Sequence, residues 1–210
     1  MQVLLVRHGE TTWNLEGRYQ GRKDPPLSHR GLLQAQALAQ RLHAEPIAAV
    51  FSSPLKRAAQ TAQVCADALG LEVTLDSRLL EISHGAWEGK LRSEIAQSQG
   101  EMLALWHEHP ERVRFPGGEG LADVRDRVTG FWVELAQKHS GMCLVVTHDV
   151  IVRLAVLAAQ DRPLADFQGV AIDNAALNRF AMNAGKFSLK TLNEAGFLGD
   201  LRSRLAEQAR

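Results

Sequence analysis

The chain has 210 residues, of which 45% are hydrophobic and 23% are charged, so it can bury one sizeable core and has little room for a second domain. Its 24 Lys and Arg residues balance its 24 Asp and Glu residues, which gives no reason to expect a nucleic-acid or anionic-membrane partner. We therefore expect one domain over residues 1–210, in which a local cluster of cations binds any anionic ligand.

The first ten residues have neither the basic start nor the long apolar region of a signal peptide. No stretch approaches the roughly 18 apolar residues that a membrane span needs. The cytoplasm is therefore the expected location. Cys65 and Cys143 both lie in apolar periodic stretches, which predicts two buried thiols and no structural zinc site.

Apolar runs alternate with helical periodicity in the first third of the chain. Residues 3–6 and 48–51 are short, continuous apolar runs that predict buried strands, and residues 72–75 are a third strand candidate. A polar loop containing glycine follows the first strand to about residue 26. Two helices are expected. The first is capped by Ser28 and ends near residue 44. The second is capped by Ser53, has Pro54 as its first residue and ends near residue 69.

The pattern is less regular between residues 76 and 118, which are rich in glycine and proline and contain one helical stretch over about residues 92–108. We expect this segment to form a lid or insert. Residues 119–139 and 149–159 predict helices on either side of a strand at residues 142–146. Two final strands are expected over residues 175–182 and 186–192, and the tail, residues 198–210, is expected to form a short surface helix.

The alternation of strands and helices predicts an α/β fold, a three-layer sandwich with a mostly parallel central sheet flanked by helices. In such sheets ligands bind beyond the carboxyl ends of the strands. Three of the predicted strands lead directly into polar residues, His8, Ser53 and His148 among them. These polar side chains are therefore expected at the edge of the sheet where the fold places an active site.

Four side chains near these strand ends have the chemistry of a phosphate site. His8 and His148 follow their strands in the same way, so their imidazoles can flank one ligand. Arg57 lies in the first turn of a predicted helix, where its guanidinium can bind an anion beside the helix terminus. Glu81 has a large apolar residue on each side, and partial desolvation of its carboxyl would raise the pKa and suit a general acid. Glu88 is the rival carboxylate.

Ordered motifs that span most of the chain carry a resemblance to a known family. The matching segments are residues 5–14 (LVRHGETTWN), 20–21 (QG), 24–28 (DPPLS), 52–62 (SSPLKRAAQTA), 80–89 (LEISHGAWEG), 117–119 (GGE), 145–148 (VVTH) and 173–177 (DNAAL). On these segments the chain resembles the histidine phosphatase superfamily, also called the phosphoglycerate mutase-like family. Residues 85–89 look like its broad-specificity phosphatase branch in particular.

The resemblance implies a catalytic role for each core residue. It implies that His8 is the nucleophile of a phosphohistidine mechanism and that Glu81 is first the proton donor and later the base. The residues implied to surround the phosphoryl group are Arg7, Arg57, His148 and Asn14, and those implied to line the substrate entrance are Gln20 and Gly21.

The implied roles agree with the physics of phosphoryl transfer. A transferring phosphoryl group spreads negative charge over its equatorial oxygens, so catalysis is mainly positioning and charge stabilisation. Two arginines supply permanent charge, a neutral His8 attacks, and a protonated His148 donates to an oxygen. Because side-chain cations do the neutralising and the histidines lack metal-ligand spacing, we expect neither a metal nor another cofactor.

Three functions remain open: a phosphatase, a mutase and a non-catalytic binder of phosphorylated ligands. A phosphatase transfers the phosphoryl group to water, whereas a mutase excludes water and returns the group to a bound sugar acid. Similar mutases tend to carry an insertion after the glutamate segment, and here only residues 82–147 separate Glu81 from His148. The resemblance therefore favours a phosphatase acting on small-molecule phosphate monoesters, and the complete set of core residues argues against the binder.

Two residues beside the implied site have no settled role. Asp149 stands where the phosphatase branch commonly has glycine. We expect Asp149 to cap the following helix. Two alternatives are that it orients His148 and that it repels a dianionic substrate. His84 adds an imidazole near Glu81, and we hypothesise that it contacts or tunes the substrate.

The substrate is not identified by the sequence. Sugar phosphates, phosphoglycerates, nucleotide monophosphates and ribazole phosphate all remain candidates, and both a monomer and a homodimer are open. The candidate specificity segments are residues 20–23 and 90–116. Within the second segment we expect Trp106 to lie in a helix core and Arg112 and Arg114 to be solvated.

Overall fold

A mixed sheet of six strands forms the centre of the computed structural model, which describes residues 1–183 and 186–203. The strand order is β3–β2–β4–β1–β5–β6. Strands β1 to β4 pair in parallel, whereas β5 runs antiparallel to both β1 and β6. The bounds are β1 Gln2–Arg7, β2 Ile47–Ser52, β3 Val73–Leu75, β4 Met142–Thr147, β5 Leu177–Asn183 and β6 Lys186–Glu194.

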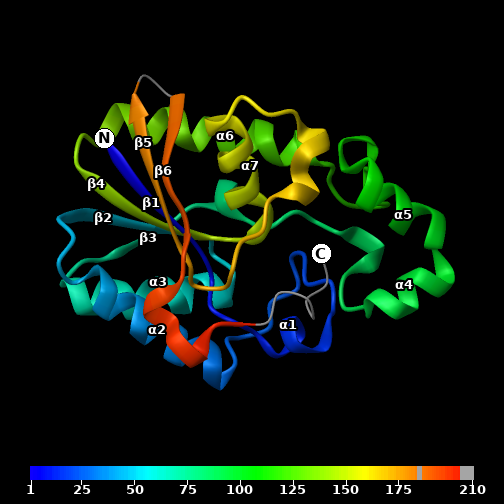
Figure 1. Cartoon of the computed structure of the whole chain (residues 1–210), viewed down its shortest axis with the longest axis horizontal. Coiled ribbons are helices and arrows are strands. Elements are labelled where there is room, and N and C mark those ends of the chain that lie inside the picture. Colours follow the sequence, from blue (N-terminus) through cyan, green and yellow to red (C-terminus); the bar gives the residue numbers. More distant parts are fainter. Residues whose placement is uncertain (184–185, 204–210) are drawn as a thin grey trace.

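Helices cover both faces of this sheet (Figure 1). Helices α2 (His29–Leu42) and α3 (Lys56–Leu69) lie on one face, and α6 (Leu121–Lys138) and α7 (Asp149–Ala159) lie on the other. The predicted three-layer α/β sandwich with a mostly parallel sheet is confirmed. The remaining helices are α1 (Thr12–Glu16), α4 (Arg92–Ser98), α5 (Gly100–Glu108) and short 3-10 turns at Ser77–Leu79, Gly85–Trp87, Pro110–Arg112, Leu164–Gly169 and Gly196–Leu201.

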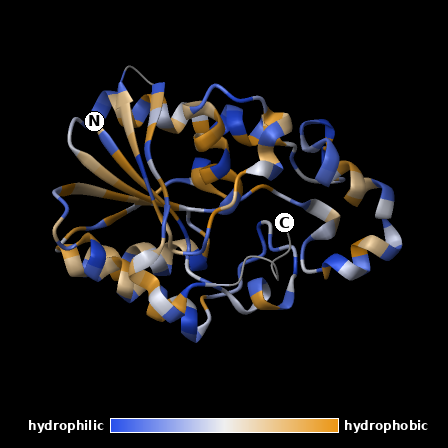
Figure 2. Ribbon diagram, in the orientation of Figure 1, coloured by the Kyte–Doolittle hydropathy of each residue, from blue (hydrophilic) through white to orange (hydrophobic). Residues whose placement is uncertain are grey.

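The apolar runs form central strands because the alternate side chains of such a strand face the helices on the two opposite sides of the sheet. In β1, Leu4 and Val6 pack with α2 and α3, while Val3 and Leu5 pack with α6 and α7. The central strands are accordingly largely hydrophobic (Figure 2), and β4 is buried at every residue. The cysteines, Cys65 and Cys143, are both buried and free, as predicted.

The start of α3 differs from the prediction. Ser28 caps α2 as expected, because its hydroxyl accepts from the Gly31 N–H. Ser53 does not cap α3, which begins at Lys56 without any side-chain cap. The Ser53 hydroxyl instead lies 2.8 Å from Nε2 of His148, so a contact between distant parts of the chain determines its partner.

Two other segments also depart from the sequence expectation. The single helix expected over residues 92–108 is divided into α4 and α5, because the backbone of Gln99 between them is not helical, with φ −145° and ψ 42°. Helix α1 forms inside a segment that was expected to be a loop. The described start of the tail forms part of the 3-10 helix Gly196–Leu201, in which Leu198 is buried. Residues 204–210 lie outside the described residues, so the surface helix expected there stays a prediction.

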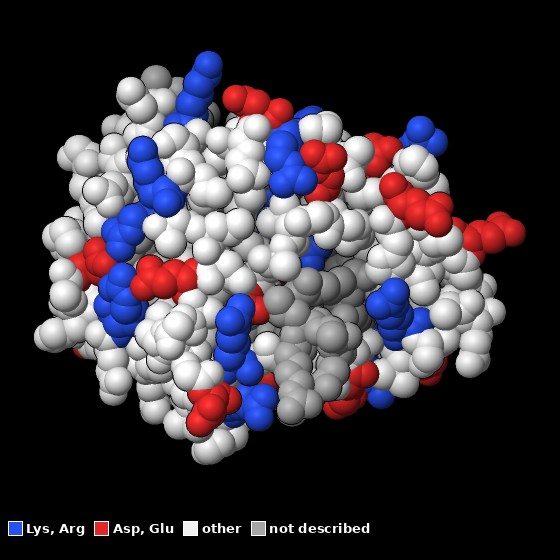
Figure 3. All heavy atoms as spheres, in the orientation of Figure 1, with Lys and Arg blue, Asp and Glu red and all other residues white. Residues whose placement is uncertain are grey.

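Helices α4 and α5 lie to one side of the sheet (Figure 1). Trp106 of α5 lines a pocket. Whether residues 76–118 act as a lid stays a prediction. Acidic and basic side chains are interspersed over the face shown in Figure 3. In the described part of the chain, no helix has the length and hydrophobicity required to span a bilayer.

Candidate active site

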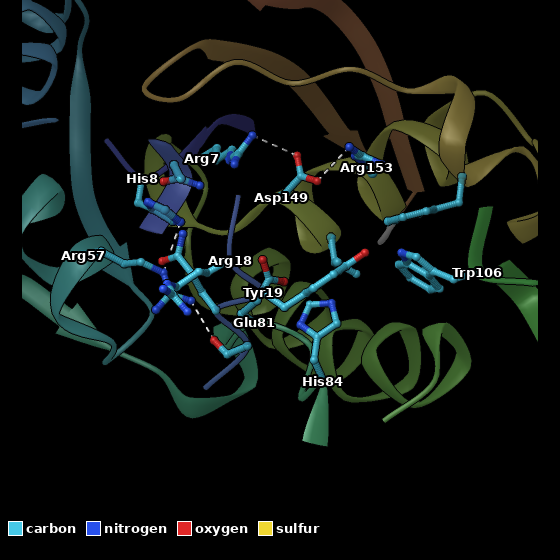
Figure 4. A pocket seen from close by; sticks show the side chains of 15 residues that line it. Arg7, His8, Arg18, Tyr19, Arg57, Glu81, His84, Trp106, Asp149 and Arg153 are labelled. Atoms are coloured by element: carbon cyan, nitrogen blue, oxygen red, sulfur yellow. Dashed lines mark hydrogen bonds and ion pairs between the residues drawn. The ribbon is translucent and has the colours of Figure 1, made fainter. Parts of the chain in front are cut away.

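The carboxyl ends of the parallel strands border a pocket that contains most of the predicted site residues (Figure 4). His148 lies directly behind this lining, with its ring centroid 5.2 Å from that of His8. The predicted residues in the lining are Arg7, His8, Asn14, Gln20, Gly21, Arg57, Glu81, His84, Trp106 and Asp149. Sequence analysis did not assign Arg18, Tyr19, Val150, Arg153 or Phe167 to the site.

His8 is held as a neutral imidazole in one tautomer. Its Nδ1 lies 2.6 Å from the carbonyl oxygen of Gly9, and because a carbonyl only accepts, Nδ1 carries the proton. Nε2 therefore presents its lone pair, to which Nε of Arg57 donates over 3.2 Å. Burial, together with the charges of Arg57 and Arg7, holds the pKa of His8 well below its ordinary value of 6.5. An uncharged Nε2 inside the pocket can attack phosphorus.

The loop that carries His8 is fixed by neighbouring elements. The His8 carbonyl accepts a hydrogen bond of 3.0 Å from the Asn174 amide, and the Gly9 N–H donates to the Thr61 hydroxyl over 3.0 Å. Helix α2 approaches so closely that a Cβ on Gly31 would lie 2.0 Å from a backbone oxygen of this loop. Only glycine permits that contact, so Gly31 allows α2 to support the loop.

Arg57 links His8 to the entrance of the pocket. Besides the bond to His8, its Nη1 donates to the Lys23 carbonyl over 2.9 Å and its Nη2 to the Gly21 carbonyl over 2.8 Å. A guanidinium has five N–H groups, so two further donors can serve a phosphoryl oxygen. Burial lowers the pKa of Arg57 to about 10, and the side chain therefore stays charged at neutral pH.

His148 differs from the expectation in its charge. Desolvation and the charge of Arg57 hold the pKa of His148 well below its ordinary value, so the imidazole is neutral in this structure. A pKa lowered in this way argues against the expected protonated His148, because burial and the neighbouring cations both disfavour the charged ring. A neutral imidazole still donates one N–H, and this donor can serve a phosphoryl oxygen.

Of the two rival glutamates, Glu81 lines the pocket and Glu88 does not. Glu81 is buried, and one of its oxygens accepts from the adjacent backbone N–H over 2.9 Å. Desolvation, with a smaller effect of the Asp149 charge, raises the pKa of Glu81 to about 7. Glu88 instead accepts from the backbone N–H groups of Arg22 and His84, so it braces two loops.

The entrance residues are held by local geometry. The Asn14 side-chain oxygen accepts from the Thr11 N–H over 3.0 Å, which orients its amide nitrogen as the donor available to a phosphate. Gly21 has a φ of +52°, and a Cβ there would lie 2.2 Å from Glu88, so the position requires glycine. The buried side-chain oxygen of Gln20 has no hydrogen-bond partner among the described residues.

Comparison with known proteins agrees with this geometry. A model of the histidine phosphatase superfamily (branch 1) matches residues 3–195. The chain belongs to this superfamily. Phosphoserine phosphatase 1 of Hydrogenobacter thermophilus is 40% identical over 201 residues, which cover 95% of each chain.

Other histidine phosphatase relatives differ in their described activities. The probable phosphoglycerate mutase GpmB of Salmonella choleraesuis is 31% identical over 180 residues, which cover 85% of this chain and 84% of that protein. The solved structure of YhfR from Bacillus stearothermophilus has a TM-score of 0.89 at 30% identity, covering 94% of this chain and 98% of that one. The predicted family and fold are thus confirmed.

Asp149 has a different role in this histidine phosphatase from the one expected. The N-cap of α7 is His148, so the prediction that Asp149 caps the helix was wrong. The Asp149 carboxylate instead forms ion pairs with Arg7 at 3.4 Å and with Arg153 at 2.9 Å. The i,i+4 spacing of Asp149 and Arg153 on one helix was visible in the sequence and could have indicated this pair.

Several aromatic rings also line the pocket. The His84 ring centroid lies 5.1 Å from that of Tyr19 and 6.3 Å from that of Trp106. Burial is the main cause that lowers the pKa of His84 to about 3, so this imidazole is neutral. Trp106 is buried as expected, and it also lines the pocket. Within residues 1–183 and 186–203, no group of three His, Cys, Asp or Glu side chains is placed to hold a metal ion.

Proposed function

We propose that the chain is a phosphatase that hydrolyses small-molecule phosphate monoesters through a phosphohistidine on His8. The observation that carries the proposal is the tautomer of His8, whose uncharged Nε2 faces Arg57 inside the pocket while Nδ1 is bound to a carbonyl. Two arginines and two imidazoles surround the same space, which suits the charge of a phosphoryl group in transfer.

In the first step, Nε2 of His8 attacks phosphorus while the bond from phosphorus to the ester oxygen breaks. Glu81 gives its proton to the departing oxygen, because its raised pKa keeps part of the carboxyl protonated near neutrality. Arg7, Arg57 and His148 donate to the equatorial oxygens. The Gly9 carbonyl holds the Nδ1 proton and so stabilises the positive charge that develops on the ring.

In the second step, water attacks the phosphorus of the phosphohistidine, and the ionised Glu81 takes the proton of that water. The bond from phosphorus to nitrogen breaks, inorganic phosphate leaves, and His8 regains its neutral tautomer. Because arginines supply the positive charge, the proposed reaction requires no metal and no cofactor.

We further propose that the enzyme works in the cytoplasm on a small phosphorylated substrate. O-phosphoserine is a candidate, because a relative is described as a phosphoserine phosphatase.

The proposal is tested by product analysis. We expect the wild-type protein to release inorganic phosphate from 4-nitrophenyl phosphate and from members of a phosphate-ester panel that includes O-phosphoserine and 3-phosphoglycerate. Conversion of 3-phosphoglycerate to its 2-isomer without release of phosphate would instead identify a mutase. If no ester is turned over, while a phosphorylated ligand still binds, the chain is a non-catalytic binder.

His84 is expected to contact the leaving group. Its buried Nδ1 has no hydrogen-bond partner among the described residues, and its ring lines the pocket. A net hydrogen bond is worth about 0.5–1.5 kcal/mol, so His84→Ala should raise KM for the preferred ester by roughly 2- to 10-fold. The KM for 4-nitrophenyl phosphate should change less, and the exposed His43→Ala is the control. An unchanged KM for every ester would make His84 purely structural.

A further inference from the structure

Next to the phosphoryl site, the pocket contains three charged side chains in a row of alternating sign (Figure 4). Arg7 lies 3.4 Å from one oxygen of Asp149, and Arg153 lies 2.9 Å from the other. The side chains of Arg7, Asp149 and Arg153 are only 5%, 16% and 1% exposed. A charge pattern this deeply buried acts with little screening on whatever enters the pocket.

Arg153 has more donor capacity than its protein partners use. Its Nη1 is 3.5 Å from the Gln168 side chain, and its Nε has no hydrogen-bond partner among the described residues. Its guanidinium also lies over the ring of Phe167, 4.8 Å from the centroid. A buried guanidinium with an unsatisfied N–H is costly, and an anionic group of a ligand can remove that cost.

Asp149 determines which charge a substrate can place between the two arginines. A phosphate ester with its phosphoryl group against Arg7 and His8 presents its leaving group to Asp149. A carboxylate there repels an anion and attracts a cation, whereas Arg153 beyond it attracts an anion. The complementary ligand therefore carries a phosphate, then a cation, then an anion.

We propose that Asp149 and Arg153 select phosphate esters of hydroxy amino acids, with Asp149 accepting from the α-ammonium group and Arg153 donating to the α-carboxylate. This inference rests on the proposed phosphatase function and specifies its substrate class. O-phosphoserine carries the three charges in the required order. 3-Phosphoglycerate has the same three-carbon skeleton, phosphate and carboxylate, but a hydroxyl group in place of the ammonium group, and so brings Asp149 no cation in addition to Arg7 and Arg153.

The test compares kcat/KM for O-phosphoserine and for 3-phosphoglycerate on the same enzyme preparation. Both esters require His8 and Glu81, so effects of a substitution on folding or on the Glu81 pKa cancel in the ratio. We expect the wild type to prefer O-phosphoserine and Asp149→Asn to lower this preference roughly 10- to 100-fold, since a hydrogen bond between charged groups is worth about 1.5–3 kcal/mol.

Arg153→Gln tests the carboxylate contact. It should lower kcat/KM for both carboxylate-bearing esters by at least roughly 10-fold relative to O-phosphoethanolamine, which has the ammonium group but no carboxylate. If the glutamine variant does not fold, Arg153→Lys retains the charge without the forked donors and should show a smaller loss of the same kind.

A matched control is available elsewhere in the chain. Glu45 is 14% exposed and also lies between two arginines, Arg41 at 2.9 Å and Arg179 at 2.6 Å, outside the pocket. Glu45→Gln should leave all substrate ratios at wild-type values. Two results would overturn this inference: a wild type that prefers 3-phosphoglycerate, or an unchanged substrate ratio in Asp149→Asn. In either case, turnover of 4-nitrophenyl phosphate would still support the proposed phosphatase. Absence of phosphate release from every ester would reject both proposals.

Discussion

Replacing His8 with alanine is expected to reduce phosphate release from every ester by roughly 10⁴-fold or more, the scale at which removal of a nucleophile acts in other enzymes. Alanine has no lone pair in place of Nε2, and none of the remaining pocket groups is held against Arg57 in the same way. The initial rate of phosphate release from O-phosphoserine and 4-nitrophenyl phosphate, measured at equal protein concentration, checks this prediction.

Chemical trapping shows whether the lost step is phosphorylation of His8. Rapid quenching of the wild type with a ³²P-labelled ester should yield protein-bound phosphate that is stable in alkali and labile in acid, and His8→Ala should yield none. His43→Ala, which changes an exposed histidine, should label like the wild type. Full activity or full labelling of His8→Ala would show that another group is the nucleophile.

Replacing Glu81 with glutamine is expected to lower kcat/KM for O-phosphoserine by roughly 10²–10⁴-fold, because glutamine cannot protonate the departing alkoxide. The ratio kcat/KM is the quantity to compare, because it excludes hydrolysis of the phosphohistidine, a step that both esters share. The loss should be smaller for 4-nitrophenyl phosphate, whose leaving group departs without much protonation. Steady-state rates for the two esters on one enzyme preparation provide the comparison. Equal losses for both esters would indicate a structural defect and not the loss of a proton donor.

The pH profile gives a second test of the same residue. The first step needs protonated Glu81, whose pKa is raised to about 7, and kcat/KM reports only the steps up to phosphorylation of His8, so kcat/KM should fall as pH rises through about 7. The pKa of His8 is held well below 6.5, so His8 stays neutral and should cause no loss between about pH 6 and 7. The fall above pH 7 should disappear in Glu81→Gln and persist in Glu88→Gln, which removes a carboxylate from the same loop. Persistence of the fall in Glu81→Gln would exclude Glu81 as its origin.

The sequence by itself determined the layered architecture and the edge of the sheet at which the candidate site lies. Continuous apolar runs such as residues 3–6 form strands between two layers of helices, and the patterns of α2, α3, α6 and α7 supply those layers. Parallel strands end at one edge of a sheet, so His8 and His148 had to approach each other once the strands were placed correctly. These features depend on local pattern and on the rules of sheet topology.

Only the tertiary structure decided which partner each polar group takes. Ser53 and Asp149 both stand where a helix cap is expected, yet Ser53 contacts His148 and Asp149 pairs with Arg7 and Arg153. The preference for a cap is worth only about 1 kcal/mol, and a buried ion pair left without its partner costs more than that. Contacts between residues far apart in the chain therefore outweigh the local preference of Ser53 and Asp149 for capping a helix. The same kind of contact places Arg153 in the pocket and lowers the pKa of His148.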